Sequence, residues 1–74
     1  MTNNLTEYLT VNSSMIKDVW YKQETKSLVL AYSSGDSYNY KDVPRDVFEG
    51  LRYAESKGSF IHSHILTKFE FCKW

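Results

Sequence analysis

Residues Leu28–Pro44, LVLAYSSGDSYNYKDVP, contain two strand-like runs, the turn that joins them and a proline that can begin a helix. In the runs Ser27–Ser33 and Ser37–Lys41, the largest side chains recur at every second position and so share one face of a strand. Gly35 between the runs favours a tight turn, because glycine adopts positive φ at little cost. Pro44 presets the backbone for the first turn of a helix. This part of the chain predicts an antiparallel hairpin that leads directly into a helix.

Flanking segments add strands and helices to the hairpin. Met15–Tyr21 is rich in β-branched and aromatic residues and predicts a strand before it. Either a bulge or packing at the strand entrance would place Ile16 in the same core as the rest of this strand. After the hairpin, apolar residues at helical spacing predict a helix over Pro44–Glu55. Ser59 is a candidate cap for a shorter second helix.

The predicted fold is an α+β domain. A three-stranded antiparallel meander is covered on one face by the Pro44–Glu55 helix, and the short second helix and a C-terminal tail complete the core. Gly50 is expected to let the first helix pack closely against the sheet, and Gly58 is expected to end that helix. Phe69 and Phe71 flank Glu70 in an alternation that predicts a last extended segment.

Length and N-terminal composition predict one domain preceded by a short flexible lead-in. A chain of 74 residues has room for a single small domain. Residues 1–12 are predicted to be a flexible lead-in, in which Leu5, Tyr8 and Leu9 have the spacing of one helical turn. Residues 13–74 are predicted to form the domain.

Composition narrows the classes of function. Nine basic residues balance nine acidic ones, which argues against a polybasic nucleic-acid binder. Cys72 is the single cysteine, so an intrachain disulfide and a cysteine zinc cluster are excluded. The N-terminus lacks signal-peptide features, and no apolar run approaches the roughly 20 residues that span a bilayer. We expect a cytoplasmic protein without membrane contact, in the host cytoplasm if a phage encodes it.

One ordered set of residues runs from about Val11 to Phe71. Its members are Ser13-Ser14, Ile16, Tyr21, Leu28, Gly35, Tyr38-Asn39-Tyr40, Val43-Pro44, Val47-Phe48, Leu51, Ala54, Ser56, Gly58, Phe60 and Ile65. With Tyr-x-Tyr before Val-Pro and Ala-x-Ser-x-Gly after it, the set resembles the KTSC domain. That family is named for its occurrence at the C-terminus of some lysyl-tRNA synthetases, and it also occurs as a stand-alone small protein in bacteria and phages.

The resemblance implies RNA binding, which has been suggested for the family largely by its context. Three positions depart from the family pattern. His62 stands where an Asn is expected, Leu66 where a basic residue is common, and Phe69 where a Tyr is expected. The loss of a basic residue at 66 weakens the inference of phosphate binding, although Lys68 lies two residues further on.

Tyr38, Tyr40 and Trp20 are the aromatic candidates for a binding surface. Tyr38 and Tyr40 share one strand face, where they form either a platform that stacks exposed bases or core rings beneath the helix. Trp20 is either an exposed interaction residue or a packing residue. Trp74 is either a docking anchor or disordered. Basic residues that could interleave with these rings are Lys17, Lys41, Arg45, Arg52 and Lys68, although ordinary solvated charge explains them more simply.

Catalytic and metal-binding patterns are weak in this sequence. Ser13-Ser14 lacks the glycines of a nucleophile elbow, and no pair of carboxylates stands out. His62 and His64 would diverge by about 200° on a helix, so they do not form a ligand pair there. We expect no enzyme activity, no cofactor and no metal.

The sequence supports two hypotheses of function. The first is a non-enzymatic module that binds RNA, single-stranded nucleic acid or a nucleotide. The alternative is a protein-interaction module, such as a phage-encoded inhibitor of a host enzyme or defence complex, which the neutral net charge fits equally well. In either case the protein is expected to be a monomer or a homodimer, since an uncovered strand edge invites pairing.

Overall fold

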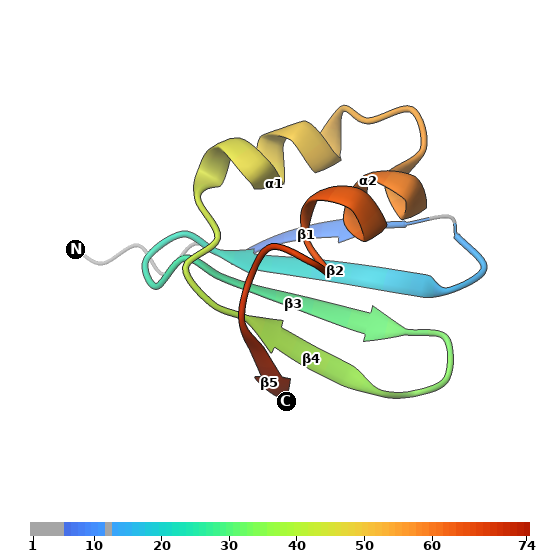
Figure 1. Ribbon diagram of the computed structural model, residues 1–74, viewed down its shortest axis with the longest axis horizontal. Helices are drawn as coiled ribbons and strands as arrows, with labels where there is room; N and C mark the ends of the chain where they lie inside the picture. Colours follow the sequence, from blue (N-terminus) through green and yellow to red (C-terminus); the bar gives the residue numbers. More distant parts are fainter. Residues whose placement is uncertain (1–5, 12) are drawn as a thin grey trace.

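A computed structural model describes residues 6–11 and 13–74, which form one sheet and two helices. The strands are β1 (Thr6–Thr10), β2 (Ile16–Lys22), β3 (Ser27–Tyr32), β4 (Ser37–Tyr40) and β5 (Phe71–Lys73), and the helices are α1 (Arg45–Arg52) and α2 (Lys57–His64). All neighbouring strands are antiparallel, in the order β1-β2-β3-β4-β5. Both helices lie on one face of the sheet, and no described element covers the other face (Figure 1).

The predicted α+β class is confirmed, but the sheet has five strands rather than three. The helical turn predicted around Tyr8 and Leu9 is wrong, because both residues lie in β1 and pair with β2. The extended segment predicted near Phe71 is confirmed as β5, which pairs with β4. The open edges of the central meander explain both additions, since each offers unpaired backbone N–H and C=O groups. Residues 1–5 and 12 of the predicted lead-in lie outside the described residues.

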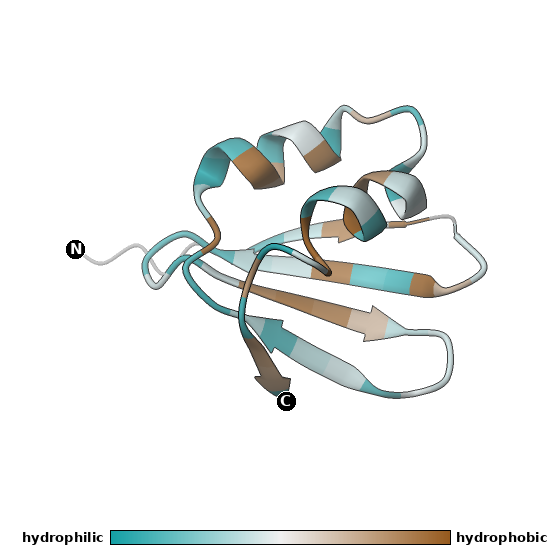
Figure 2. Cartoon of the chain, in the orientation of Figure 1, coloured by the Kyte–Doolittle hydropathy of each residue, from teal (hydrophilic) through white to brown (hydrophobic). Residues whose placement is uncertain are grey.

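The core lies between the sheet and the helices. The register of β2 on β3 shifts between Ile16 and Asp18, which confirms a bulge and leaves Ile16 and Val19 buried together. Tyr21 stacks on Phe48 of α1, with ring centroids 4.9 Å apart. Fully buried side chains are Ile16, Val19, Tyr21, Leu28, Leu30, Val43, Phe48, Leu51, Ile61 and Ile65. Figure 2 shows hydrophobic segments in the central strands and at intervals along the helices above them.

The helix ends differ from the prediction. Pro44 occupies the cap position of α1, and Ser56 rather than Ser59 caps α2, with its hydroxyl accepting from the Ser59 N–H at 3.4 Å. Gly58 lies inside α2 instead of ending α1. Gly50 permits a close approach to Phe60 of α2, not to the sheet as predicted. The helices therefore pack against each other as well as against the strands.

Candidate binding site on the open sheet face

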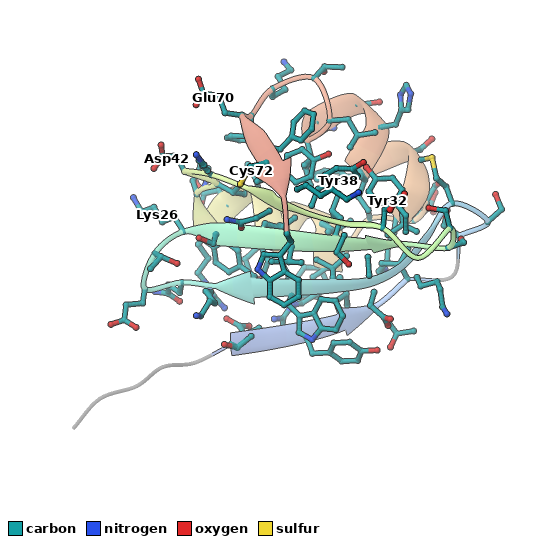
Figure 3. The ribbon with its side chains drawn as sticks, turned by 90° about the horizontal axis from the view of Figure 1, so that it is seen from below. Lys26, Tyr32, Tyr38, Asp42, Glu70 and Cys72 are labelled. Carbon is teal, nitrogen blue, oxygen red and sulfur yellow. The ribbon has the colours of Figure 1, made fainter. Side chains whose placement is uncertain are left out.

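A row of five side chains crosses the uncovered face of the sheet. Tyr8, Trp20, Val29, Asn39 and Cys72 are directly paired from β1 to β5. Directly paired residues point to the same side of a sheet, so all five lie on one face. Their sequence neighbours on the central strands point into the core, which identifies this as the face away from the helices. Figure 3 views the molecule from that side, with Cys72 labelled on β5.

Two tryptophans bound a groove on this face. The groove has a volume of about 510 Å³. Its lining residues are Thr6, Trp20, Lys22, Thr25, Ser27, Val29, Asn39 and Trp74. The Trp74 backbone N–H donates to the Ser37 carbonyl at 3.0 Å, which continues the β4–β5 ladder and holds Trp74 beside the sheet. Because Trp74 is 76% exposed, its indole is accessible to a ligand. We call this hollow the open-face groove.

Tyr8 extends the aromatic surface beyond the open-face groove. The rings of Tyr8 and Trp20 lie 5.5 Å apart at 46°. The Tyr8 hydroxyl donates to the Asp18 carboxylate and accepts from Thr10 Oγ1 at 3.3 Å, which orients the ring. Tyr8 is 55% exposed, whereas Trp20 is half-buried. The two rings form an oriented surface on which a planar group can stack.

The polar groups of the open-face groove are few. Lys22 is exposed and supplies an ammonium group at the lining. Asn39 Oδ1 is buried and has no hydrogen-bond partner among the described residues. A buried acceptor without a partner costs free energy. The open-face groove is therefore an aromatic and apolar surface with a small number of polar contacts.

Tyr38 and Tyr40 do not join Trp20 on this face. They pair with Leu30 and Leu28, so they point toward the helices. Tyr40 is only 3% exposed, and Tyr38 is half-buried. Burial, and then the neighbouring Tyr32 hydroxyl, raise the pKa of Tyr40 well above its ordinary value. Core packing therefore accounts for Tyr40, as one of the two alternatives expected.

Arg45 and Arg52 are engaged by acidic residues at the β1 edge. Glu7 of β1 accepts hydrogen bonds from both guanidinium groups. Arg45 also lies 2.8 Å from a Glu49 carboxylate oxygen and donates to Gln23 Oε1 at 2.6 Å. The hydrogen bond from Arg45 is the main reason that the pKa of Glu7 is lowered, and Glu7 in turn raises the pKa of Arg45. These ion pairs neutralise the two arginine charges, which the sequence had suggested as possible contacts to phosphate.

The remaining basic candidates lie apart. Lys17 is exposed in the β2 bulge, Lys41 is exposed just after β4, and Lys68 is exposed after α2. None of the three lines the open-face groove. Of the eight candidate residues, the structure therefore places Trp20 alone in that lining.

Sequence reasoning missed most of the open-face groove. The alternation along Ser27–Ser33 places Val29 on the strand face opposite the core-facing residues. Val29 could therefore have been predicted to share a sheet face with Trp20. Tyr8 and Trp74 gave no such signal, because their faces depend on the pairing of β1 and β5. Within the described part of the chain, no three His, Cys, Asp or Glu side chains gather as metal ligands. The two helices there have eight residues each, far fewer than a bilayer crossing needs.

The fold and groove define a small α+β domain with one uncovered sheet face. The sequence pattern of the KTSC domain matches residues 12–69, and the chain belongs to the KTSC domain family. The crystal structure of a KTSC domain protein from Yersinia pestis superposes with a TM-score of 0.86 at 27% identity, covering 95% of this chain and 99% of that one.

Relatives of this chain include both large and small proteins. It is 41% identical over 58 residues to a lysine–tRNA ligase of Nostoc punctiforme, covering 78% of this chain and 10% of the ligase. It is 36% identical over 59 residues to a protein of Tsukamurella paurometabola, covering 80% of this chain and 88% of that protein. The chain thus spans about a tenth of the ligase and most of the smaller relative.

Proposed function

We propose that this protein is a non-enzymatic, cytoplasmic binding module that holds single-stranded RNA, or the bases of a nucleotide, in the open-face groove. The single observation that carries the proposal is the pair of tryptophans, Trp20 and Trp74, that bound an accessible groove on an uncovered sheet. Bases stack on such rings for about 1–3 kcal/mol each, with little dependence on sequence. Tyr8 beside Trp20 offers a further ring.

The relatives support RNA as the ligand. The lysine–tRNA ligases of Nostoc punctiforme and Trichormus variabilis carry a region similar to this chain, and their names state that they act on a tRNA. A domain attached to an enzyme of that kind has RNA within reach. The similarity covers 10% of each ligase, so no part of the ligase reaction is carried over to this chain.

The charges favour stacking over phosphate contacts. The chain has no net charge, Arg45 and Arg52 are paired with acidic residues, and Lys22 lines the open-face groove. For one to three phosphate contacts on a single strand, the logarithm of the binding constant falls with the logarithm of salt at a slope of about −0.7 to −2. We expect a slope in that range and an affinity that depends mainly on the rings.

Binding of a short fluorescently labelled single-stranded RNA, followed by anisotropy over a salt series, tests the proposal. Trp20→Leu and Trp74→Ala should each weaken binding by roughly fivefold or more, the loss of about one stacked base. Tyr53→Ala is the matched control, because Tyr53 is 77% exposed but lies at the C-cap of α1. No binding at low salt, or equal losses in the Tyr53 variant, would refute the proposal.

A protein partner is the second candidate for the same face. The observation that favours it is the pair of exposed rings on this face, Tyr8 at 55% and Trp74 at 76% exposure, in a chain without net charge. Exposed aromatic groups of this kind are typical of interaction sites. A phage-encoded inhibitor of a host enzyme or defence complex would be one example of such a protein-interaction module. Capture of one defined host protein that survives nuclease treatment and is lost in Trp20→Leu would favour this candidate over RNA.

A further inference from the structure

We propose that a second hollow, on the helix face of β3, β4 and β5, is an aromatic cage that binds a methylated ammonium group. The hollow has a volume of about 390 Å³. Tyr32, Tyr38, Tyr40 and Phe71 line it together with Leu66 and Asp36. The Tyr38–x–Tyr40 motif contributes two of these rings, and the open-face groove uses neither. The inference is independent of RNA binding, because the two hollows lie on opposite faces of the sheet.

The rings of the cage present π faces in different directions. Tyr38 lies 5.5 Å from Tyr32 at 86° and 5.5 Å from Phe71 at 83°. The Phe71 ring in turn lies 5.2 Å from Tyr40 at 34°. Figure 3 shows Tyr32 and Tyr38 beside each other on the helix side of their strands. An ammonium group attracted to an aromatic face within about 6 Å of its centre can thus contact more than one ring.

Packing holds part of the cage in place and leaves part accessible. Tyr40 is buried, and its hydroxyl lies 3.3 Å from the Tyr32 hydroxyl. Phe71 is 53% exposed on β5, so one wall of the cage faces solvent. Because the Tyr40 ring is already held in place, a ligand that enters beside Phe71 would not have to order every ring of the cage.

The mouth of the cage carries one carboxylate and one ammonium group, Asp36 and Lys73. The Asp36 carboxylate lines the hollow, and the Ser34 hydroxyl donates to it at 3.3 Å. Lys73 pairs with Tyr38 in the sheet, and its ammonium group lies 3.7 Å from Asp36. A bound cation would share the Asp36 carboxylate with the Lys73 ammonium group, and the Lys73 ammonium group would repel it. Loss of Asp36 and loss of Lys73 should therefore change the affinity in opposite directions.

Methylated ammonium fits the cage better than a primary ammonium. Methyl groups spread the charge and contact the rings directly, and recognition of choline and methyl-lysine uses cages of this type. A primary ammonium would leave N–H donors facing carbon, with one carboxylate to accept them. The hollow therefore selects the methylated ammonium group, which a free choline-like molecule and a methylated lysine side chain have in common.

Titration of the full chain with choline, followed by two-dimensional amide NMR, tests the inference. Choline should give saturable shifts in residues 32–40 and 66–73, with millimolar affinity. The uncharged isostere, in which carbon replaces the choline nitrogen, should bind at least about fivefold more weakly, since it lacks the cation–π attraction. Equal binding of the two compounds, or no saturable shift with choline, would overturn the inference.

Variants separate the cage from general folding effects. Phe71→Leu and Tyr38→Leu should each lower choline affinity, and the amide spectrum shows whether each variant is folded. Tyr53→Leu removes a more exposed ring outside the cage and should leave the affinity unchanged. Asp36→Asn should weaken binding and Lys73→Gln should strengthen it, and the same sign for both would contradict the cage. A trimethyllysine peptide that binds more tightly than choline would assign the source to a protein partner, and the reverse order would assign it to a free ligand.

Discussion

Gly50 of α1 lies against the ring of Phe60 in α2, so closely that a Cβ atom on residue 50 would come within 2.8 Å of Phe60 Cζ. Phe60 is itself restrained, because its ring stacks on His64 at a centroid distance of 4.3 Å and packs against the core. The absence of a side chain at Gly50 therefore sets how closely the two helices approach each other.

Gly50→Ala should destabilise the protein although it improves helix propensity. The substitution gains about 1 kcal/mol in the helix, but overpacking against Phe60 costs about 1–3 kcal/mol. In a Phe60→Leu background the ring is gone, and the same alanine should raise stability. Urea unfolding of the four proteins gives the coupling free energy. A stabilising alanine in both backgrounds would contradict the contact.

Glu7→Gln should lower the melting temperature by roughly 4 °C, equivalent to about 1 kcal/mol in a domain of this size. Glu7 accepts from Arg45 and Arg52 and so ties β1 to α1. Solvent screening of these partly exposed charges keeps the effect small, and added salt should reduce it further. The measurement is thermal unfolding at two salt concentrations. A salt-independent difference would exclude an electrostatic origin.

Glu7 also predicts that the free energy of unfolding depends on pH. The pKa of Glu7 is lowered from 4.5 in the folded protein, chiefly by the hydrogen bond from Arg45. Stability from this group is complete above the unfolded value and is lost as the pH falls through the lowered folded pKa. Unfolding free energies measured from pH 7 to acid should therefore decline below about pH 4.5, with a shallower decline in Glu7→Gln. Parallel pH curves for the two proteins would show that Glu7 does not contribute.

Tyr21→Phe should cost about 1–2 kcal/mol, because it leaves a buried acceptor without its donor. The buried Tyr21 hydroxyl donates to the Val43 carbonyl at 2.6 Å. Burial also raises the pKa of Tyr21 from 10.0, so its stabilisation is complete below that pH and is lost as the pH rises through the folded pKa. The difference between wild type and variant in denaturant unfolding should narrow above pH 10. Tyr53→Phe, at an exposed ring, should change nothing.

Ser56→Ala should destabilise α2 by about 1 kcal/mol, the usual value of an N-cap. Ser59→Ala should have little effect, because Ser59 supplies a backbone N–H to the cap and its side chain is exposed. Chemical unfolding of both variants distinguishes the observed helix start from the predicted one. A larger loss in Ser59→Ala would favour the predicted start.

Attachment of a bulky maleimide to Cys72 should block RNA binding. Cys72 is exposed and pairs with Asn39 in the row that crosses the open face, so the adduct would cover the open-face groove. RNA anisotropy before and after labelling measures the loss, which should be at least tenfold. Cys72→Ser, treated with the same reagent, should bind as before. Unchanged binding by the labelled protein would place RNA elsewhere.

The prediction of the central fold depended on local signals. Alternation placed Leu28 and Leu30 on one strand face, Gly35 marked the turn, and Pro44 marked the start of the helix. These signals are local because side-chain periodicity and turn chemistry involve residues close in the chain. The cap of α2 was assigned to the wrong serine, since Ser56 and Ser59 have similar propensities and the helix packing chose between them.

The candidate site could be predicted only in part. Trp20 was identified because strand alternation places it on the face opposite the core residues of its strand. Arg45 and Arg52 looked available for phosphate, since nothing in their local sequence indicated Glu7, 38 and 45 residues away. Long-range ion pairs of this kind leave no periodic trace in a sequence.

By itself, the sequence determined the class of fold, the central hairpin, the helix that follows it and the family to which the chain belongs. The tertiary structure alone decided that β1 and β5 pair as the two edge strands of the sheet, and therefore that Tyr8, Trp74 and Trp20 share one face. The physical reason is that edge strands form by backbone hydrogen bonds to a neighbour that must already be in place. Which face a terminal side chain occupies follows from that register, because a shift of one residue would turn it to the other side.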